Sequence, residues 1–139
     1  MTKTNLFLLK LGTIQTSLMG LYHFYIPFQY NWRNYLEQRS PTINWSLFSL
    51  NNYFSFNLLV IALFLGYYLF RKQDKKEVIK VLSSIILLFW IFSTVYQLIE
   101  PMPLPEHLKW IGFILLGVAF LNGLIFFIPL ISLVKKKKS

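Results

Sequence analysis

The chain has 139 residues, of which 55% are apolar and 19% aromatic, and its mean hydropathy is +0.51. This composition is too apolar for an ordinary water-soluble domain of this length and indicates one membrane domain over residues 1–139. The net charge of +9 comes from basic residues that lie in short runs beside long apolar segments. We therefore predict a lipid bilayer, and not nucleic acid, as the partner of these charges. The sequence has no cysteine, which excludes disulfides, thiolate metal sites and a cysteine nucleophile.

Four segments are long and apolar enough to be read as membrane spans: 6–28, 53–70, 78–99 and 108–134. A hydrocarbon core of roughly 30 Å needs about 20 helical residues, and a spanning backbone must satisfy its own hydrogen bonds. The alternating pattern of a membrane barrel is absent. The first segment runs into bulky tyrosines without a small-residue cleavage site, so we expect it to be retained as a span. The predicted fold is an all-α, integral membrane four-helix bundle.

The connections between the four helices differ in length and composition. We expect residues 29–52 to form an outer loop that lies along the membrane interface, with a short amphipathic helix over 31–38. The turn-forming pair Asn51 and Asn52 would then start the second helix. The linker "RKQDKKEVIK" is short and predicts a hairpin of the second and third helices. Three prolines in "EPMPLPEH" predict a stiff, extended turn before the last helix.

Lysine and arginine counts predict the orientation, because basic loops are retained on the cytoplasmic side. Eleven basic residues fall on one side: Lys3, Lys10, Arg71, Lys72, Lys75, Lys76, Lys80 and Lys135 to Lys138. The other side has Arg33, Arg39 and Lys109. Both termini should therefore be cytoplasmic. We favour a bacterial inner membrane, with the "KKKK" tail as an anchor on anionic lipid.

Polar residues inside the predicted spans gather in the outer half of the bundle. His23, Asn51, Ser55, Gln97 and Glu100 all fall there, and Tyr96 is one of several aromatic residues at the same level. These six residues are the predicted ligand-binding site. Neutral members of such a group commonly form hydrogen bonds between helices. Ionisable residues at membrane depth more often mark a functional site, so His23 and Glu100 are a candidate proton-exchanging pair.

Other site chemistries find little support in the sequence. The two histidines, His23 and His107, are poorly placed to hold a haem together, because His107 lies in the proline turn. There is no HExxH pair or other close histidine spacing, so we predict no metal. We find no nucleophile-elbow motif and no glycine-rich phosphate loop either, and we expect a non-enzymatic protein.

The string "LLKLGTIQTSLMGLYHF", residues 8–24, resembles the start of the DoxX-like membrane proteins. In both, a basic residue early in the first helix precedes small residues and a glycine close to a histidine. Here those positions are Lys10, Gly20 and His23, with lysine where an arginine is more usual. The four-span layout with cytoplasmic termini is similar too. The resemblance implies a functionally mixed family, some members of which are tied to quinone-linked redox reactions.

Two functions follow as expectations from these patterns. The first is a small membrane protein that is an accessory or scaffold subunit for a protein partner, or that binds a lipophilic small molecule in its outer half. The alternative is a quinone-linked oxidoreductase subunit with His23 and Glu100 at the quinone ring. A transporter is disfavoured because the helix centres lack charges and there is no internal repeat. No cofactor other than quinone is expected.

Overall fold

The structure, a computed structural model, describes residues 1–36, 40–101, 104 and 106–135. Within these residues every regular element is helical, which confirms the all-α prediction. The elements are α1 (Lys3–Gln29), α2 (Trp32–Leu36), α3 (Pro41–Arg71), α4 (Lys76–Ile99), the 3-10 helix η1 (Glu106–Leu108) and α5 (Lys109–Lys135). Arg39, three residues of the proline-rich turn (102, 103 and 105) and the tail from Lys136 onward lie outside the described residues.

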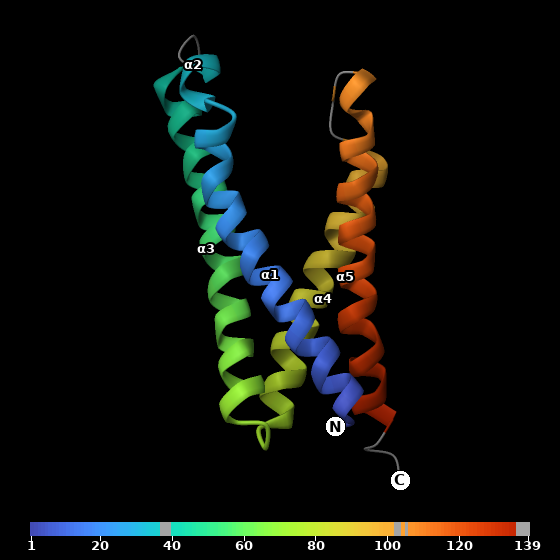
Figure 1. The fold of residues 1–139 in the computed structure, drawn as a ribbon. Coiled ribbons are helices and arrows are strands. Elements are labelled where there is room, and N and C mark those ends of the chain that lie inside the picture. The colour runs from blue at the N-terminus through green and yellow to red at the C-terminus, as the bar shows by residue number, and fades with distance from the viewer. Residues whose placement is uncertain (37–39, 102–103, 105, 136–139) are drawn as a thin grey trace.

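The four long helices form two arms that meet at one end, so the molecule has the shape of a V (Figure 1). One arm pairs α1 with α3, and the other pairs α4 with α5. At the closed end α1 packs against α5 and α3 packs against α4. The N-terminus, the end of α5 and the turn between α3 and α4 all lie at this closed end, and α2 lies at the open end (Figure 1).

Three helical stretches are both long enough and apolar enough to cross a membrane. They are Pro41–Arg71, Lys76–Ile99 and Glu106–Leu133. Helix α1, the first of the four predicted spans, has a comparable length but is not among them. The reason is its polar content, since it carries Lys10, Gln15 and a series of threonines and serines. A fourth span therefore stays a prediction.

Helix α3 begins at Pro41, twelve residues before the predicted span at 53–70. The outer loop expected over 29–52 is thus largely helical, and its predicted short helix over 31–38 is found as α2, Trp32–Leu36. Proline at the first position of α3 favours a helix start, and no proline or glycine follows until Gly66. Asn51 and Asn52 do not start the helix because asparagine disfavours a helix interior only weakly. The 31 residues of α3 measure roughly 46 Å at 1.5 Å per residue.

Small and polar residues form the buried face of α1. Its buried positions include Asn5, Gly12, Thr13, Thr16 and Gly20. A Cβ on Gly12 would lie 2.7 Å from a ring atom of Phe126 in α5, and a Cβ on Gly20 would lie 3.0 Å from the backbone nitrogen of Leu59 in α3. Small side chains let helices approach closely where packing, and not water exclusion, holds them together.

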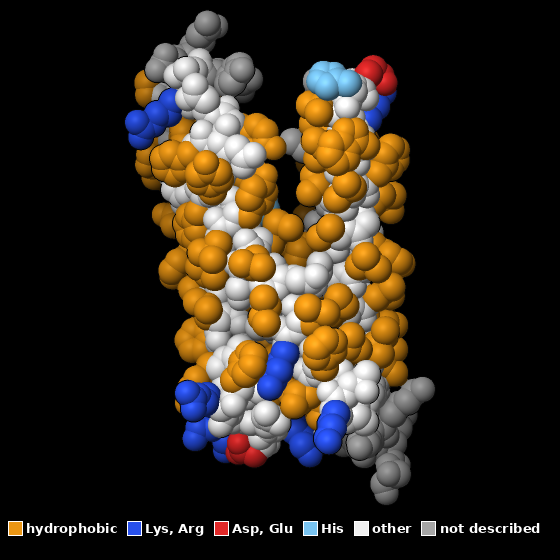
Figure 2. Space-filling view, viewed as in Figure 1, with side chains coloured by type: hydrophobic (Ala, Val, Ile, Leu, Met, Phe, Trp, Pro, Cys, Tyr) orange, Lys and Arg blue, Asp and Glu red, His pale blue; other side chains and the backbone are white. Residues whose placement is uncertain are grey.

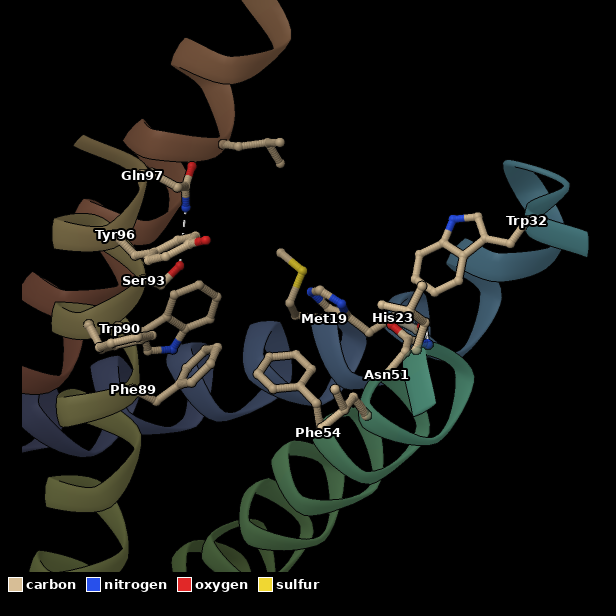
Figure 3. A pocket seen from close by; sticks show the side chains of 14 residues that line it. Met19, His23, Trp32, Asn51, Phe54, Phe89, Trp90, Ser93, Tyr96 and Gln97 are labelled. Atoms are coloured by element: carbon tan, nitrogen blue, oxygen red, sulfur yellow. Dashed lines mark hydrogen bonds between the residues drawn. The ribbon is translucent and has the colours of Figure 1, made fainter. Parts of the chain in front are cut away.

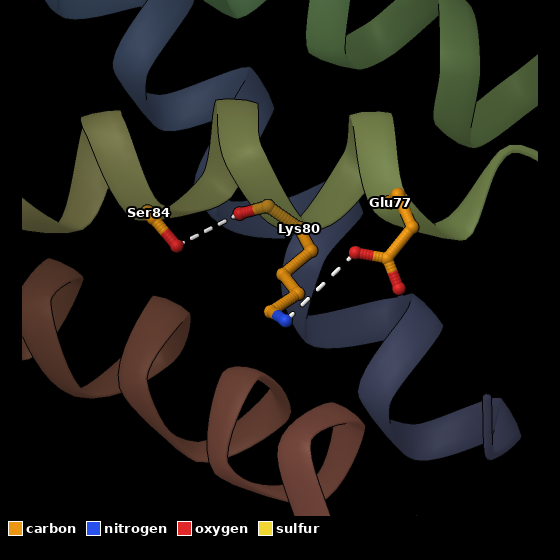
Figure 4. Close-up of polar contacts among 3 residues, drawn as sticks. All are labelled: Glu77, Lys80 and Ser84. Carbon is orange, nitrogen blue, oxygen red and sulfur yellow. Dashed lines mark hydrogen bonds and ion pairs between the residues drawn. The ribbon is translucent and has the colours of Figure 1, made fainter. Parts of the chain in front are cut away.

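Basic residues gather at the closed end, and apolar side chains cover the visible face between the two ends (Figure 2). Lys10 places its Nζ 4.3 Å from the centroid of the Phe70 ring, a cation–π contact between α1 and α3. Lys80 forms an ion pair with Glu77, at 3.8 Å, and its backbone carbonyl accepts a hydrogen bond from Ser84 (Figure 4). Lys10 thus contacts a neighbouring helix, and Lys80 is paired within its own helix.

Candidate ligand-binding cleft

A cleft of about 590 Å³ lies between the two arms. Its volume falls within the usual range of small-molecule sites, roughly 300–1,000 Å³. Most of its lining is aliphatic or aromatic, and none of the described lining residues is aspartate, glutamate, lysine or arginine. The residues that line it are Met19, His23, Trp32, Leu47, Leu50, Asn51, Phe54, Phe89, Trp90, Phe92, Ser93, Tyr96, Gln97 and Leu115.

Aromatic contacts between the arms form the floor of this cleft. The Phe54 and Phe89 rings, from α3 and α4, have centroids 5.4 Å apart. Phe89 also packs against Trp90, with centroids 5.1 Å apart. The Trp90 indole is buried and donates from Nε1 to Thr16 Oγ1 at 3.1 Å, which joins α4 to α1. The floor is therefore apolar, and its one polar group is already paired.

The polar side chains of the cleft lie on two opposite walls (Figure 3). His23 and Asn51 belong to the α1 and α3 wall, and the His23 ring meets the edge of Phe54 at a centroid distance of 4.7 Å. Tyr96 and Gln97 belong to the α4 wall. Gln97 donates from Nε2 to Ser93 Oγ at 3.1 Å, and this bond leaves the amide oxygen of Gln97 as an additional acceptor.

Asn51 has a structural partner that explains its position. Its Nδ2 donates to the backbone carbonyl of His23 at 2.8 Å. In an uninterrupted helix that carbonyl would accept from residue 27, but Pro27 has no backbone N–H. The Asn51 amide replaces the missing donor and so joins α3 to α1 beside the cleft.

Four of the six predicted site residues, His23, Asn51, Tyr96 and Gln97, line the same cleft. The other two do not. Ser55 is fully buried, and its hydroxyl donates to the Asn51 carbonyl at 2.6 Å, one turn earlier in α3. Glu100 caps the end of α4, is exposed and is not part of the cleft lining. The structure therefore does not form the expected pair of His23 with Glu100, because α4 ends at Ile99 and carries Glu100 beyond the cleft.

Several lining residues carry no signal in the sequence. Phe89, Phe92 and Leu115 are apolar residues inside apolar helices, and nothing in their spacing separates them from residues that face lipid. Trp32 is recognisable only as an interfacial aromatic residue, and the short helix α2 places it at the cleft. Their positions depend on the angle between the arms.

Among the described residues, no group of three or more histidine, cysteine, aspartate or glutamate side chains lies within reach of one metal ion. The comparisons with known proteins add no assignment: no family model, no curated protein and no solved structure matches this chain. The resemblance to the DoxX-like proteins therefore stays a prediction, and the cleft has to be interpreted from its own chemistry.

Proposed function

We propose that this protein binds an uncharged lipophilic molecule in the cleft between its two arms. The observation that carries the proposal is the cleft itself, with an aromatic floor and polar side chains on both walls. Such a site suits a ligand with an apolar body and a small polar head. The body would lie against Phe54 and Phe89, and the head would lie between His23 and Gln97.

The lining argues against a charged ligand. An ionised group moved into an apolar, water-poor site loses its hydration and needs an opposite charge beside it. None of the described lining residues is a lysine or arginine that could pair with an anion, and none can supply a carboxylate to pair with a cation. Histidine, tyrosine, glutamine and indole groups instead offer neutral hydrogen bonds, which fix the orientation of a head group.

A quinone is the second candidate ligand, and the opposed walls favour it over other flat molecules. Its two carbonyl groups could accept hydrogen bonds from His23 on one wall and Tyr96 on the other. Glu100 takes no part in this arrangement, because it lies outside the cleft. If quinone is the ligand, organic extraction of the purified protein yields it, and the His23→Ala variant carries much less.

The setting we propose is a bacterial inner membrane with both termini in the cytoplasm. The support is the basic closed end, where the N-terminus, the end of α5 and the turn between α3 and α4 lie together. In that orientation the open end of the cleft faces the outer leaflet.

Ligand-dependent stabilisation tests the proposal. We would delipidate the purified protein, add back fractions of a membrane lipid extract, and measure its thermal unfolding. A ligand that binds only the folded state raises the unfolding temperature by several degrees once its concentration is about 100 times the dissociation constant. The Ser93→Phe variant fills the cleft and should lose this response.

The matched control is Leu88→Phe, which adds the same side chain to the same helix. Leu88 is 65% exposed and is not among the lining residues, so the control should keep the response. An equal response in all three proteins, or none in the wild type, would contradict the proposal and direct attention to a membrane protein partner.

A further inference from the structure

A second, smaller groove lies on the other side of α1, between α1 and α5. Its volume is about 280 Å³, and it is adjacent to the cleft because Met19 and Trp90 line both. None of its described lining residues carries a charge. The lining consists of Gln15, Leu18, Met19, Tyr22, Trp90, Val118 and Asn122.

Asn122 is the unusual member of this groove. It is the central residue of α5, thirteen residues from Lys109 and thirteen from Lys135, and it is 2% exposed. Its Nδ2 donates to the Val118 carbonyl one turn earlier, at 2.9 Å. That bond assigns the two ends of the amide, because only the NH₂ group can donate to a carbonyl. The Oδ1 is then the free end, and it accepts no hydrogen bond from the described residues.

An unpaired amide oxygen at this depth requires an explanation. A buried acceptor without a donor is costly, and the centre of a long apolar helix is far from bulk water. Two other buried side-chain atoms of the described residues also lack a partner, Ser83 Oγ and Asn44 Oδ1, but neither residue lines the cleft or this groove. Thr16, in contrast, accepts from Trp90, and its own hydroxyl donates to the Gly12 carbonyl at 2.7 Å. Asn122 therefore lines the groove and carries a covered acceptor that lacks a partner among the described residues.

We propose that the groove between α1 and α5 binds the hydroxyl end of a single-chain lipid alcohol, and that Asn122 Oδ1 accepts the hydrogen bond from this hydroxyl. A hydroxyl supplies the donor that the oxygen lacks and carries no charge, as the uncharged lining requires. The apolar chain of the ligand would leave the groove past Leu18, a lining residue that is 60% exposed. This site is separate from the proposed cleft and does not depend on it.

Entry of the hydroxyl requires a side chain to move, because Oδ1 is covered in the structure. Met19 lies in the wall shared by the two cavities. Its unbranched side chain has three rotatable bonds and repacks easily, so it can move aside without a change in the helices.

The test compares two photoreactive probes in phosphatidylcholine vesicles that contain the full chain. One probe is hexadecanol with a diazirine in its chain, and the other is its methyl ether, which has the same chain but no hydroxyl donor. Labelled peptides of α1 and α5 are then quantified by mass spectrometry. In the wild type the alcohol should label the groove about fivefold more than the ether, the ratio that one net hydrogen bond provides.

Three variants test whether Asn122 causes the preference for the alcohol over the ether. Asn122→Leu has a similar volume but no acceptor and should label equally with both probes. Gln15→Leu should keep the preference for the alcohol. This variant excludes the alternative that the Gln15 amide donates the hydrogen bond to Asn122 Oδ1. Ser93→Phe blocks the cleft and should also keep it, so failure of the proposed function leaves this result unchanged.

Equal labelling by the two probes in the wild type would overturn the proposal without relying on any variant. So would a preference that survives in Asn122→Leu, or one that is lost in Gln15→Leu. Circular dichroism of each variant checks that the helices are intact before labelling is compared.

Discussion

At the residue scale, Asn51 shows why one sequence gives only part of this site. The presence of Pro27 is enough to predict that the His23 carbonyl has no donor within its own helix, because proline has no backbone N–H. The sequence does not indicate the replacement donor, which lies 28 residues away on another helix. The sequence groups His23, Asn51, Tyr96 and Gln97 correctly, because helix spacing fixes their level along the predicted spans. The same reasoning fails for Glu100, because its side chain falls just after the end of α4.

The Asn51 amide should therefore matter only while Pro27 is present. Asn51→Leu leaves the partly buried His23 carbonyl without a donor and should lower the free energy of unfolding by about 1–3 kcal/mol. In a Pro27→Ala background the helix supplies its own N–H, so the same change should cost much less. A double-mutant cycle in detergent measures the difference.

Asn57→Leu is the matched control for this cycle. The Asn57 amide donates to the Tyr53 carbonyl within its own helix at an exposed position, so its loss should have little effect. Equal costs of Asn51→Leu with and without Pro27 would show that the Asn51 hydrogen bond has another role.

At the element scale, close approach of the helices decides the architecture. The sequence predicts the long helices well, because apolar runs of this length leave few alternatives. It misplaces the start of α3, since the polar first turns of this helix have no distinct apolar signal. It also gives no measure of how near α1 lies to α3. Gly20 sets that distance, because a Cβ there would meet the backbone of Leu59.

Gly20→Ala should separate α1 from α3 and lower the free energy of unfolding by about 1–3 kcal/mol, the usual cost of overpacking. Backbone atoms cannot move aside as a flexible side chain can. Gly117→Ala has no atom within 4 Å of the new Cβ and should be neutral or stabilising by up to about 1 kcal/mol through helix propensity. Unfolding by detergent titration measures both, and a Gly20→Ala protein as stable as Gly117→Ala would contradict the close packing.

At the scale of the whole molecule, the V shape and the charge distribution have different origins. The basic closed end can be predicted from the sequence, because the positions of the lysines and arginines relative to the predicted helices show which helix ends carry them. The cleft cannot, because it depends on where the arms touch. Trp90 with Thr16 and Phe54 with Phe89 join the arms at the floor, and above them the walls separate.

Cysteine labelling tests the proposed orientation, and the absence of native cysteine makes every introduced thiol unique. Lys75→Cys, in the turn between α3 and α4, should react with a membrane-impermeant maleimide only after the cells are permeabilised. Asn34→Cys, on α2 at the open end, should react in intact cells. The reverse pattern would place the termini outside the cytoplasm.

The most direct test of the central claim is native mass spectrometry of the protein released from its own membrane, with Ser93→Phe and Leu88→Phe measured beside it. We predict one uncharged lipophilic molecule bound to the wild type and to Leu88→Phe, and its absence from Ser93→Phe. If all three proteins are released empty, or carry the same bulk phospholipids, the cleft is not a ligand site and the proposed function is wrong.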